Sequence, residues 1–287
     1  MAEPHPVLAG TETHRLQSNA VGREFVIFVG HCGPAGAVPE AVLYLTDANG
    51  MFGLTVDTVR LMQLMDLVPP MLVVGVGYPL GAIDETIDIR MLDLTPTVDE
   101  LYSGVVPGAP PSGGGPAFGM FVRHELQPWV GDAFGPVPER AVYFGHSLGG
   151  LFGAWMLCTQ PDAFTDYILG SPSLWWDRGV AFEVEQAYAD GHDDLAARVF
   201  VGIGGDETQD GRLREAARLP AETQEMLAAW PIDMVNDVER FVTTLRGRCY
   251  PSLELASGLF ADEFHVTVAG VNLSRGLRRS STSAEAL

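Results

Sequence analysis

The sequence contains no lysine, and all of its basic residues are arginines. These 17 arginines are outnumbered by 37 aspartates and glutamates, so the formal net charge of the 287 residues is −20 at pH 7. Nucleic acid is therefore not expected as a partner, because binding to a phosphate backbone needs a basic face. The absence of lysine also excludes Schiff-base chemistry, P-loop phosphate binding and Ser-Lys catalysis.

Cysteines and long hydrophobic runs are also scarce. The three cysteines, Cys32, Cys158 and Cys249, suit neither a disulfide framework nor a zinc site, and we expect neither a metal nor a cofactor. No run of about eighteen apolar residues occurs, so no membrane-spanning segment is expected. The first ten residues lack the basic and apolar regions of a secretory signal, which favours a cytoplasmic protein.

Short apolar runs typical of buried strands alternate with segments of helical spacing. Strands are expected at residues 25–29, 41–45, 71–76, 141–144, 165–170 and 198–203, and helices at 55–65, 118–129 and 148–157. This alternation predicts a mostly parallel central sheet flanked by helices, in one α/β domain over residues 1–287. Within it we expect a flexible Gly/Pro loop at 104–116, a lid or pocket segment at 178–197 and a frayed tail at 280–287.

The most informative motif is G-x-S-x-G at residues 145–149. A strand-like run precedes it and a helix-like run follows it, which is the context of a nucleophile elbow. In such an elbow a serine projects from strained backbone at the end of a sheet, so Ser147 is the predicted nucleophile. The following helix directs free N–H groups at a developing oxyanion, with Leu148 N–H as the first donor. We expect the second donor near Ala48 or Asn49.

The partners of the nucleophile are restricted by chain order, because α/β-hydrolases carry the serine first, then the acid, then the histidine. His192 and His265 are the histidines that follow Ser147. His192 lies in a hydrophilic stretch typical of the surface, so His265 is the predicted base. The acid should follow a strand between these two residues, and both Asp206 and Glu207 satisfy that condition.

Several further segments, taken with the elbow, resemble the esterase D-like branch of the α/β-hydrolases. This branch includes ferric-siderophore esterases, S-formylglutathione hydrolases, feruloyl esterases and the antigen 85 mycolyltransferases. The resemblance extends from about Thr13 to Leu277 and rests on residues 42–47, 73–79, 90–97, 145–152 and 170–176. The Ser-Pro-Ser-Leu-Trp-Trp run in the last segment is most similar to the siderophore-esterase group.

The resemblance implies the α/β-hydrolase fold and a serine carboxylic-ester hydrolase that forms an acyl-enzyme without a cofactor. It implies Ser147 as nucleophile and His265 as base. Through a Gly-x-x-Glu pattern counted from Gly204, it implies Glu207 as the acid, with Asp206 as the second candidate. The expected partner is a small-molecule ester, with neither nucleic acid nor membrane involved.

The resemblance also bears on the pocket and on rival functions. Trp175 and Trp176 are expected to wall the substrate pocket. One alternative is a siderophore trilactone esterase, for which Arg123, Arg178 or Arg212 would supply cationic groups. Another is an acyltransferase that uses the same triad with an alcohol acceptor. A non-catalytic binding protein of this fold is disfavoured, because both the serine and the histidine are present.

Overall fold

The computed structural model describes residues 8–79, 86–106, 108–221, 224–225, 228 and 231–281. It contains an eight-stranded sheet in the order β1-β2-β4-β3-β5-β6-β7-β8. The strands are β1 Thr11–Gln17, β2 Glu24–Cys32, β3 Ala41–Leu45, β4 Met71–Gly77, β5 Ala141–His146, β6 Asp166–Gly170, β7 Ala197–Gly204 and β8 Leu253–Phe260. β2 is antiparallel to β1 and β4, and the other pairs are parallel. The predicted mostly parallel sheet is confirmed.

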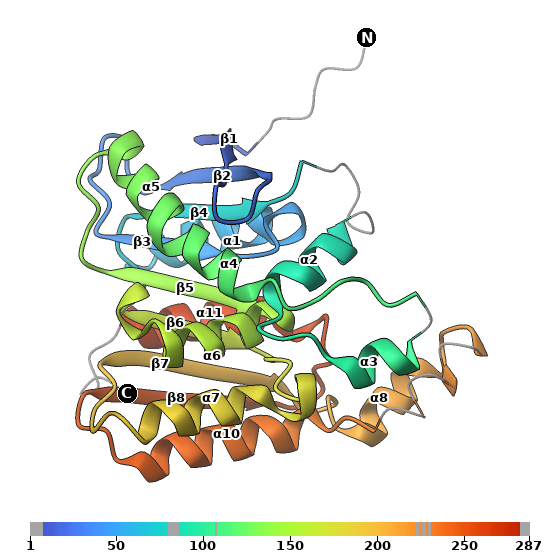
Figure 1. The fold of residues 1–287 in the computed structure, drawn as a ribbon. Coiled ribbons are helices and arrows are strands. Elements are labelled where there is room, and N and C mark those ends of the chain that lie inside the picture. The colour runs from blue at the N-terminus through green and yellow to red at the C-terminus, as the bar shows by residue number, and fades with distance from the viewer. Residues whose placement is uncertain are drawn as a thin grey trace.

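Helices cover both faces of this sheet (Figure 1). They are α1 Ala48–Gln63, α2 Ile87–Leu94, α3 Glu100–Val105, α4 Gly115–Phe121, α5 Gln127–Phe134, α6 Leu148–Thr159, α7 Val180–Ala189, α8 Gln209–Ala216, α10 Met234–Arg248 and α11 Val268–Ser281. α1 and α11 pack on one face, where Phe52, Val56 and Leu273 are buried together. α4 to α7 and α10 cover the other face, where Phe118 and Phe241 are buried. None of the helices described is long and apolar enough to cross a membrane.

Burial along each strand follows its position in the sheet. Every residue of the central strand β4 is buried, as expected of a strand covered on both faces. The edge strand β1 has no fully buried residue. Its polar sequence gave no strand signal, and its pairing with β2 rather than a local apolar pattern holds it in place.

The helix expected at 118–129 is divided. α4 is followed by one π-helical turn, Val122–Leu126, before α5 begins. Pro128 explains the irregularity, because it has no N–H to donate to the preceding turn. The helix expected at 55–65 begins earlier, at Ala48, directly after β3.

The expected Gly/Pro loop and the expected lid or pocket segment both contain regular structure. Residues 104–105 belong to α3 and residues 115–116 to α4, so the connection between them is shorter than the predicted loop. The segment 178–197, expected to be a lid or pocket wall, holds α7, whose apolar face is buried in the core. Of the predicted tail, residues 280–281 end α11 and residues 282–287 lie outside the described residues.

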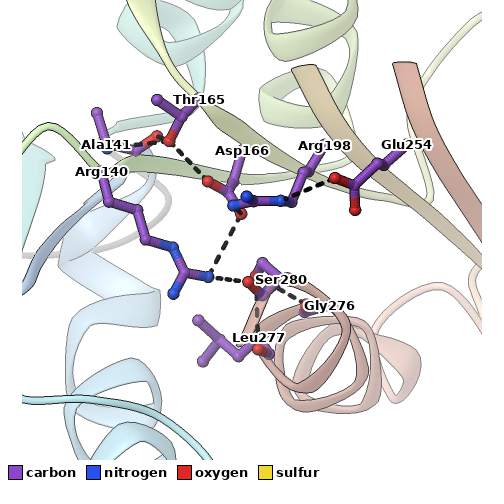
Figure 2. Close-up of polar contacts among 9 residues, drawn as sticks. All are labelled: Arg140, Ala141, Thr165, Asp166, Arg198, Glu254, Gly276, Leu277 and Ser280. Atoms are coloured by element: carbon purple, nitrogen blue, oxygen red, sulfur yellow. Dashed lines mark hydrogen bonds and ion pairs between the residues drawn. The ribbon is translucent and has the colours of Figure 1, made fainter. Parts of the chain in front are cut away.

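A cluster of charged side chains anchors the last helix beneath the sheet (Figure 2). Asp166, at the start of β6, is fully buried and lies 3.4 Å from Arg140 and 3.6 Å from Arg198. Arg140 also donates to the backbone carbonyl of Ser280 near the end of α11. The cluster therefore fixes α11 against β5 and β6, and the other end of α11 approaches the loops at the carboxyl ends of the strands.

Candidate active site

The G-x-S-x-G segment forms a sharp turn between β5 and α6. Ser147 adopts φ 61° and ψ −119°, a strained conformation for a residue with a side chain. A Cβ atom on Gly145 would lie 2.3 Å from the carbonyl oxygen of Gly149, and one on Gly149 would lie 2.4 Å from Thr46 Oγ1. The two glycines are therefore required by close packing, and the turn exposes Ser147 to the cavity described below.

Glu207, on the loop after β7, faces the histidine. Its fully buried carboxylate lies 2.6 Å from His265 Nδ1 through Oε2. The other oxygen, Oε1, accepts hydrogen bonds from Ser171 Oγ at 2.6 Å and from Gly204 N–H at 2.9 Å. Both carboxylate oxygens are thus occupied, and the free rotation of the side chain is removed.

Asp206, the second candidate acid, faces away from the histidine. Its side chain is 41% exposed and forms an ion pair with Arg214 at 2.8 Å. In contrast to its side chain, the backbone N–H of Asp206 donates to the carbonyl of Glu263 at 3.1 Å. This bond ties the loop after β7 to the turn that carries His265. Of the two carboxylates that the sequence left open, the structure therefore brings Glu207 to the imidazole.

His265 lies in the turn between β8 and α11, with its ring packed at 4.7 Å between centroids on that of His146, the residue before the nucleophile. Within the described residues, Ser147 Oγ forms its hydrogen bond with Ser173 Oγ at 3.4 Å, and none of 3.5 Å or less joins it to the imidazole. Hydrogen bonds of this kind are often long without substrate and shorten in the Michaelis complex.

His146 is a partly buried imidazole whose ring packs on that of the base. Its two ring nitrogens have no hydrogen-bond partner among the residues that the structure describes. Burial lowers the pKa of His146 well below its usual value, and the neighbouring His265 and Arg90 act in the same direction. The sequence analysis assigned no role to this residue, because a histidine inside the elbow motif gives no separate signal.

The expected oxyanion donors lie at the starts of two helices. Leu148 is the first residue of α6, where backbone N–H groups have no partner within the helix, and it lines the cavity beside Ser147. Asn49 lies in the first turn of α1. Its side-chain Oδ1 accepts a hydrogen bond from Tyr78 N–H at 2.8 Å, and its Nδ2 donates one to the carbonyl of Tyr78 at 3.0 Å. This side chain thus joins α1 to the end of β4, and the Asn49 backbone donor stays a prediction.

A cavity of about 270 Å³ opens in front of the nucleophile. The residues that line it come from the elbow, from α2 and α3, from the turn after β6 and from the region around α8: Arg90, Met91, Tyr102, Val106, Ser147, Leu148, Ser173, Trp175, Arg212 and Ile232. None of them belongs to residues 178–197. The predicted site residues Ser147, Leu148 and Trp175 thus share one cavity wall.

The two tryptophans expected to wall the pocket have different environments. Trp175 lines the cavity. Trp176 is fully buried, and its indole N–H donates to the carbonyl of Thr97 at 3.2 Å. The expectation for Trp176 is therefore wrong, because its side chain is packed in the hydrophobic core and does not line the cavity. Asp99 holds the turn by accepting a hydrogen bond from Asp177 N–H at 2.9 Å.

Two arginines line the cavity of this otherwise acidic protein. Arg90, which the sequence analysis missed, donates to both carboxylate oxygens of Asp47 at 2.6 and 3.1 Å. Burial opposes the charge of Arg90, but the ion pair with Asp47 outweighs it and the pKa of Arg90 is raised. Nothing local in the sequence links Arg90 to the elbow, because the fold brings them together.

Arg212 is the second cavity arginine, and one of three that the sequence suggested. Its Nη1 donates to the carbonyl of Ile232 at 3.1 Å, and its other guanidinium nitrogens form no hydrogen bond with the described residues. Burial lowers the pKa of Arg212, and the nearby charge of Glu207 opposes that change. Arg123 instead pairs with Asp162, and Arg178 is not among the residues that line the cavity.

A strained serine between a strand and a helix, on a mostly parallel sheet with a histidine–carboxylate pair beside it, defines an α/β-hydrolase. Residues 35–231 match the Esterase family model, which is described as "Putative esterase". The chain belongs to this family, and the expected family and fold are confirmed.

Named relatives agree with this assignment. The chain is 34% identical to ferri-bacillibactin esterase BesA of Bacillus subtilis over 60% of its own length and 61% of that protein. It is 27% identical to siderophore triacetylfusarinine C esterase of Aspergillus fumigatus, over 84% of this chain and 82% of that protein. The first match thus spans about three fifths of the relative's length. Both relatives are named as esterases, which is the reaction class predicted from the sequence.

Solved structures share the fold over nearly the whole chain. The crystal structure of BES protein from Bacillus cereus superposes with a TM-score of 0.80 at 25% identity and covers 99% of this chain and 100% of its own. Siderophore hydrolase EstA from Aspergillus nidulans superposes with a TM-score of 0.79 at 23% identity and covers 98% of each chain. The strands and helices of this chain are therefore arranged as in these two solved structures.

Proposed function

We propose that this protein hydrolyses carboxylic esters through Ser147, His265 and Glu207. The observation that carries the proposal is the 2.6 Å contact between His265 Nδ1 and the buried Glu207 carboxylate, beside the strained elbow of Ser147. Glu207 accepts the Nδ1–H, which leaves Nε2 as the basic nitrogen. That nitrogen takes the Ser147 proton as Oγ attacks the ester carbonyl.

The reaction then proceeds in two halves. The tetrahedral oxyanion is stabilised by the backbone N–H of Leu148 and by a second N–H at Asn49. The imidazolium of His265 returns its proton to the leaving alkoxide, the C–O bond of the ester breaks and an acyl-serine remains. Water then gives a proton to His265 and attacks the acyl carbon. His265 returns this proton to Ser147 Oγ as the acyl C–O bond breaks, and the acid is released.

The test of this mechanism is the variant Ser147→Ala, assayed with a p-nitrophenyl ester. We expect turnover to fall by at least about 10³-fold, since no nucleophile remains. Ser18→Ala is the control, because Ser18 lies outside the site and its Oγ accepts a hydrogen bond from Val21 N–H. Esterase activity that survives in Ser147→Ala at the level of the control contradicts the mechanism.

We further propose a siderophore ester as the substrate class. Relatives of this chain bear that name, and the cavity combines the apolar side chains of Met91 and Trp175 with the cationic Arg90 and Arg212. An iron-chelating ligand presents anionic oxygens, and a guanidinium binds such groups by charge-assisted hydrogen bonds. Arg212 thus offers a cationic group to an anionic ligand within a strongly acidic, lysine-free chain.

The substrate proposal is tested by comparing kcat/KM for a siderophore trilactone, with and without Fe³⁺, with that for a feruloyl ester and for p-nitrophenyl esters of rising chain length. We expect the trilactone to be the best substrate. An equal or higher kcat/KM for the simple esters contradicts this proposal. The same reactions with added alcohol acceptors measure acyl transfer, and we expect hydrolysis products. A cytoplasmic location stays a prediction, which cell fractionation would test.

A further inference from the structure

A line of buried polar side chains lies behind the carboxylate of the proposed triad. Ser171 follows β6, Glu207 follows β7 and Asn272 lies in α11, and all three side chains are fully buried. Ser171 Oγ lies 2.6 Å from Glu207 Oε1, and Asn272 Nδ2 lies 3.4 Å from Ser171 Oγ. The contacts therefore run from the last helix, through a hydroxyl, to the oxygen of Glu207 that faces away from His265.

Chemistry assigns the direction of each hydrogen bond in this line. An ionised carboxylate can only accept, so the hydroxyl of Ser171 donates its single proton to Glu207. The oxygen of Ser171 is then left with lone pairs, one of which accepts from the Asn272 amide. Asn272 thus fixes the rotation of the hydroxyl, and the hydroxyl fixes the carboxylate.

We propose that Ser171, oriented by Asn272, is a positioning residue that holds the Glu207 carboxylate in the orientation that the His265 imidazole requires. The inference rests on the proposed function, since it concerns the acid of that triad. Without Ser171, Oε1 keeps only the bond from Gly204 N–H, and the carboxylate can rotate about its last bond. His265 would then lose the fixed acceptor that selects its tautomer.

The backbone of Ser171 supports a role beyond packing. Ser171 has φ 40°, in the left-handed region that favours glycine, and strain of this kind usually persists where surrounding structure enforces it. Its N–H donates to the carbonyl of Gly202 at 2.7 Å, which fixes this conformation. Glycine would fit the turn without strain, but only a residue with a hydroxyl can reach Glu207.

Asn272 supports the same inference. Its Oδ1 has no hydrogen-bond partner among the described residues, although the side chain is fully buried. Such a group is costly for stability. The sheet also leaves room for the amide, because a Cβ atom on Gly202 would lie 2.0 Å from Asn272 Oδ1. An apolar side chain would be the more stable choice at this position, so the amide is better explained by its bond to Ser171.

The decisive variants are Ser171→Ala and Ser171→Gly, with Ser18→Ala as the control. Alanine removes the hydroxyl and keeps the backbone strain, whereas glycine removes both. We expect kcat to fall about 10- to 100-fold in both Ser171 variants, which corresponds to one hydrogen bond to a charged group, with KM within about twofold. Full kcat in Ser171→Gly would overturn the proposal, because the hydroxyl would then be dispensable.

A double-mutant cycle shows whether Ser171 acts through Glu207. In a Glu207→Ala background, we expect Ser171→Gly to cause no further loss of kcat, because its partner is already absent. Equal losses in both backgrounds would contradict the proposed route. If Ser147→Ala is inactive while both Ser171 variants keep full kcat, the proposed function stands and only this inference fails.

Asn272→Leu separates positioning from stability. The two side chains are similar in size, so we expect unchanged or higher resistance to urea together with a kcat lowered about 3- to 10-fold, as for one neutral hydrogen bond. A kcat equal to that of the unaltered protein would remove Asn272 from the proposal. A fall in kcat that is matched by a loss of folded protein would assign Asn272 a structural role instead.

Discussion

Asp206 and Glu207 are consecutive in the chain, yet their carboxylates lie in opposite environments. Glu207 is fully buried against His265 at 2.6 Å, and Asp206 is 41% exposed and paired with Arg214 at 2.8 Å. A single loop thus holds a candidate catalytic acid and a matched control of the same charge.

The first prediction compares these two acids. Glu207→Gln should lower kcat by about 10³- to 10⁴-fold, because an amide can leave the imidazole in the wrong tautomer. Asp206→Asn should change kcat less than about twofold, since an exposed ion pair contributes little. Steady-state kinetics with one p-nitrophenyl ester measure both. A larger effect at Asp206 than at Glu207 would reverse the assignment.

The second prediction concerns stability and pH at His146. Its pKa is lowered below 6.5 by burial, so the unfolded chain binds this proton first as the pH falls. The contribution to stability is complete above 6.5 and is lost between 6.5 and the lower pKa of the folded state, at up to about 1.4 kcal/mol per pH unit. Unfolding in urea at about pH 7.5 and 5.5 should therefore show a smaller acid loss for His146→Gln. The same loss in both proteins would contradict a lowered pKa of His146.

The third prediction uses the space around two glycines. Gly145→Ala should destabilise the fold by about 1–3 kcal/mol or more, since its Cβ would lie 2.3 Å from the carbonyl of Gly149. Gly247→Ala, in α10, meets no atom within 4 Å and should stabilise by about 0.4–1 kcal/mol. Urea midpoints measure both changes. The expectation fails if the two variants shift in the same direction.

The fourth prediction tests the charge of the cavity. Arg212→Gln should raise KM for an anionic siderophore ester about 10- to 100-fold and leave KM for neutral p-nitrophenyl acetate within about twofold. Arg123→Gln is the control, because Arg123 pairs with Asp162 outside this cavity. Equal increases in KM for the charged and neutral esters would indicate general damage rather than recognition of charge.

The sequence predicted those elements that can be recognised from their own residue types. The apolar runs of β3 and β4 and the glycines of the elbow are of this kind, because burial and close approach leave a direct trace in residue type. β1 was missed, because its polar residues form a strand only through pairing with β2.

Chain order and the family resemblance were sufficient to predict part of the site. Ser147 and His265 were both named from the sequence, and the structure places His265 against the residue that precedes the nucleophile. Chain order left Asp206 and Glu207 open, the Gly-x-x-Glu pattern of the resemblance favoured Glu207, and in the structure Glu207 faces His265. Arg90 was missed, since it reaches the elbow only through the packing of α2.

The cavity is assembled from two kinds of parts. The reacting groups follow the carboxyl ends of β5, β7 and β8, whereas Tyr102, Val106, Arg212 and Ile232 come from α3, α8 and the connections beside them. Replacing those connections would alter which esters enter without moving the nucleophile. Relatives with this scaffold can therefore differ in substrate specificity and keep the same reaction. Exchanging the outer segments between them is a direct route to new selectivity.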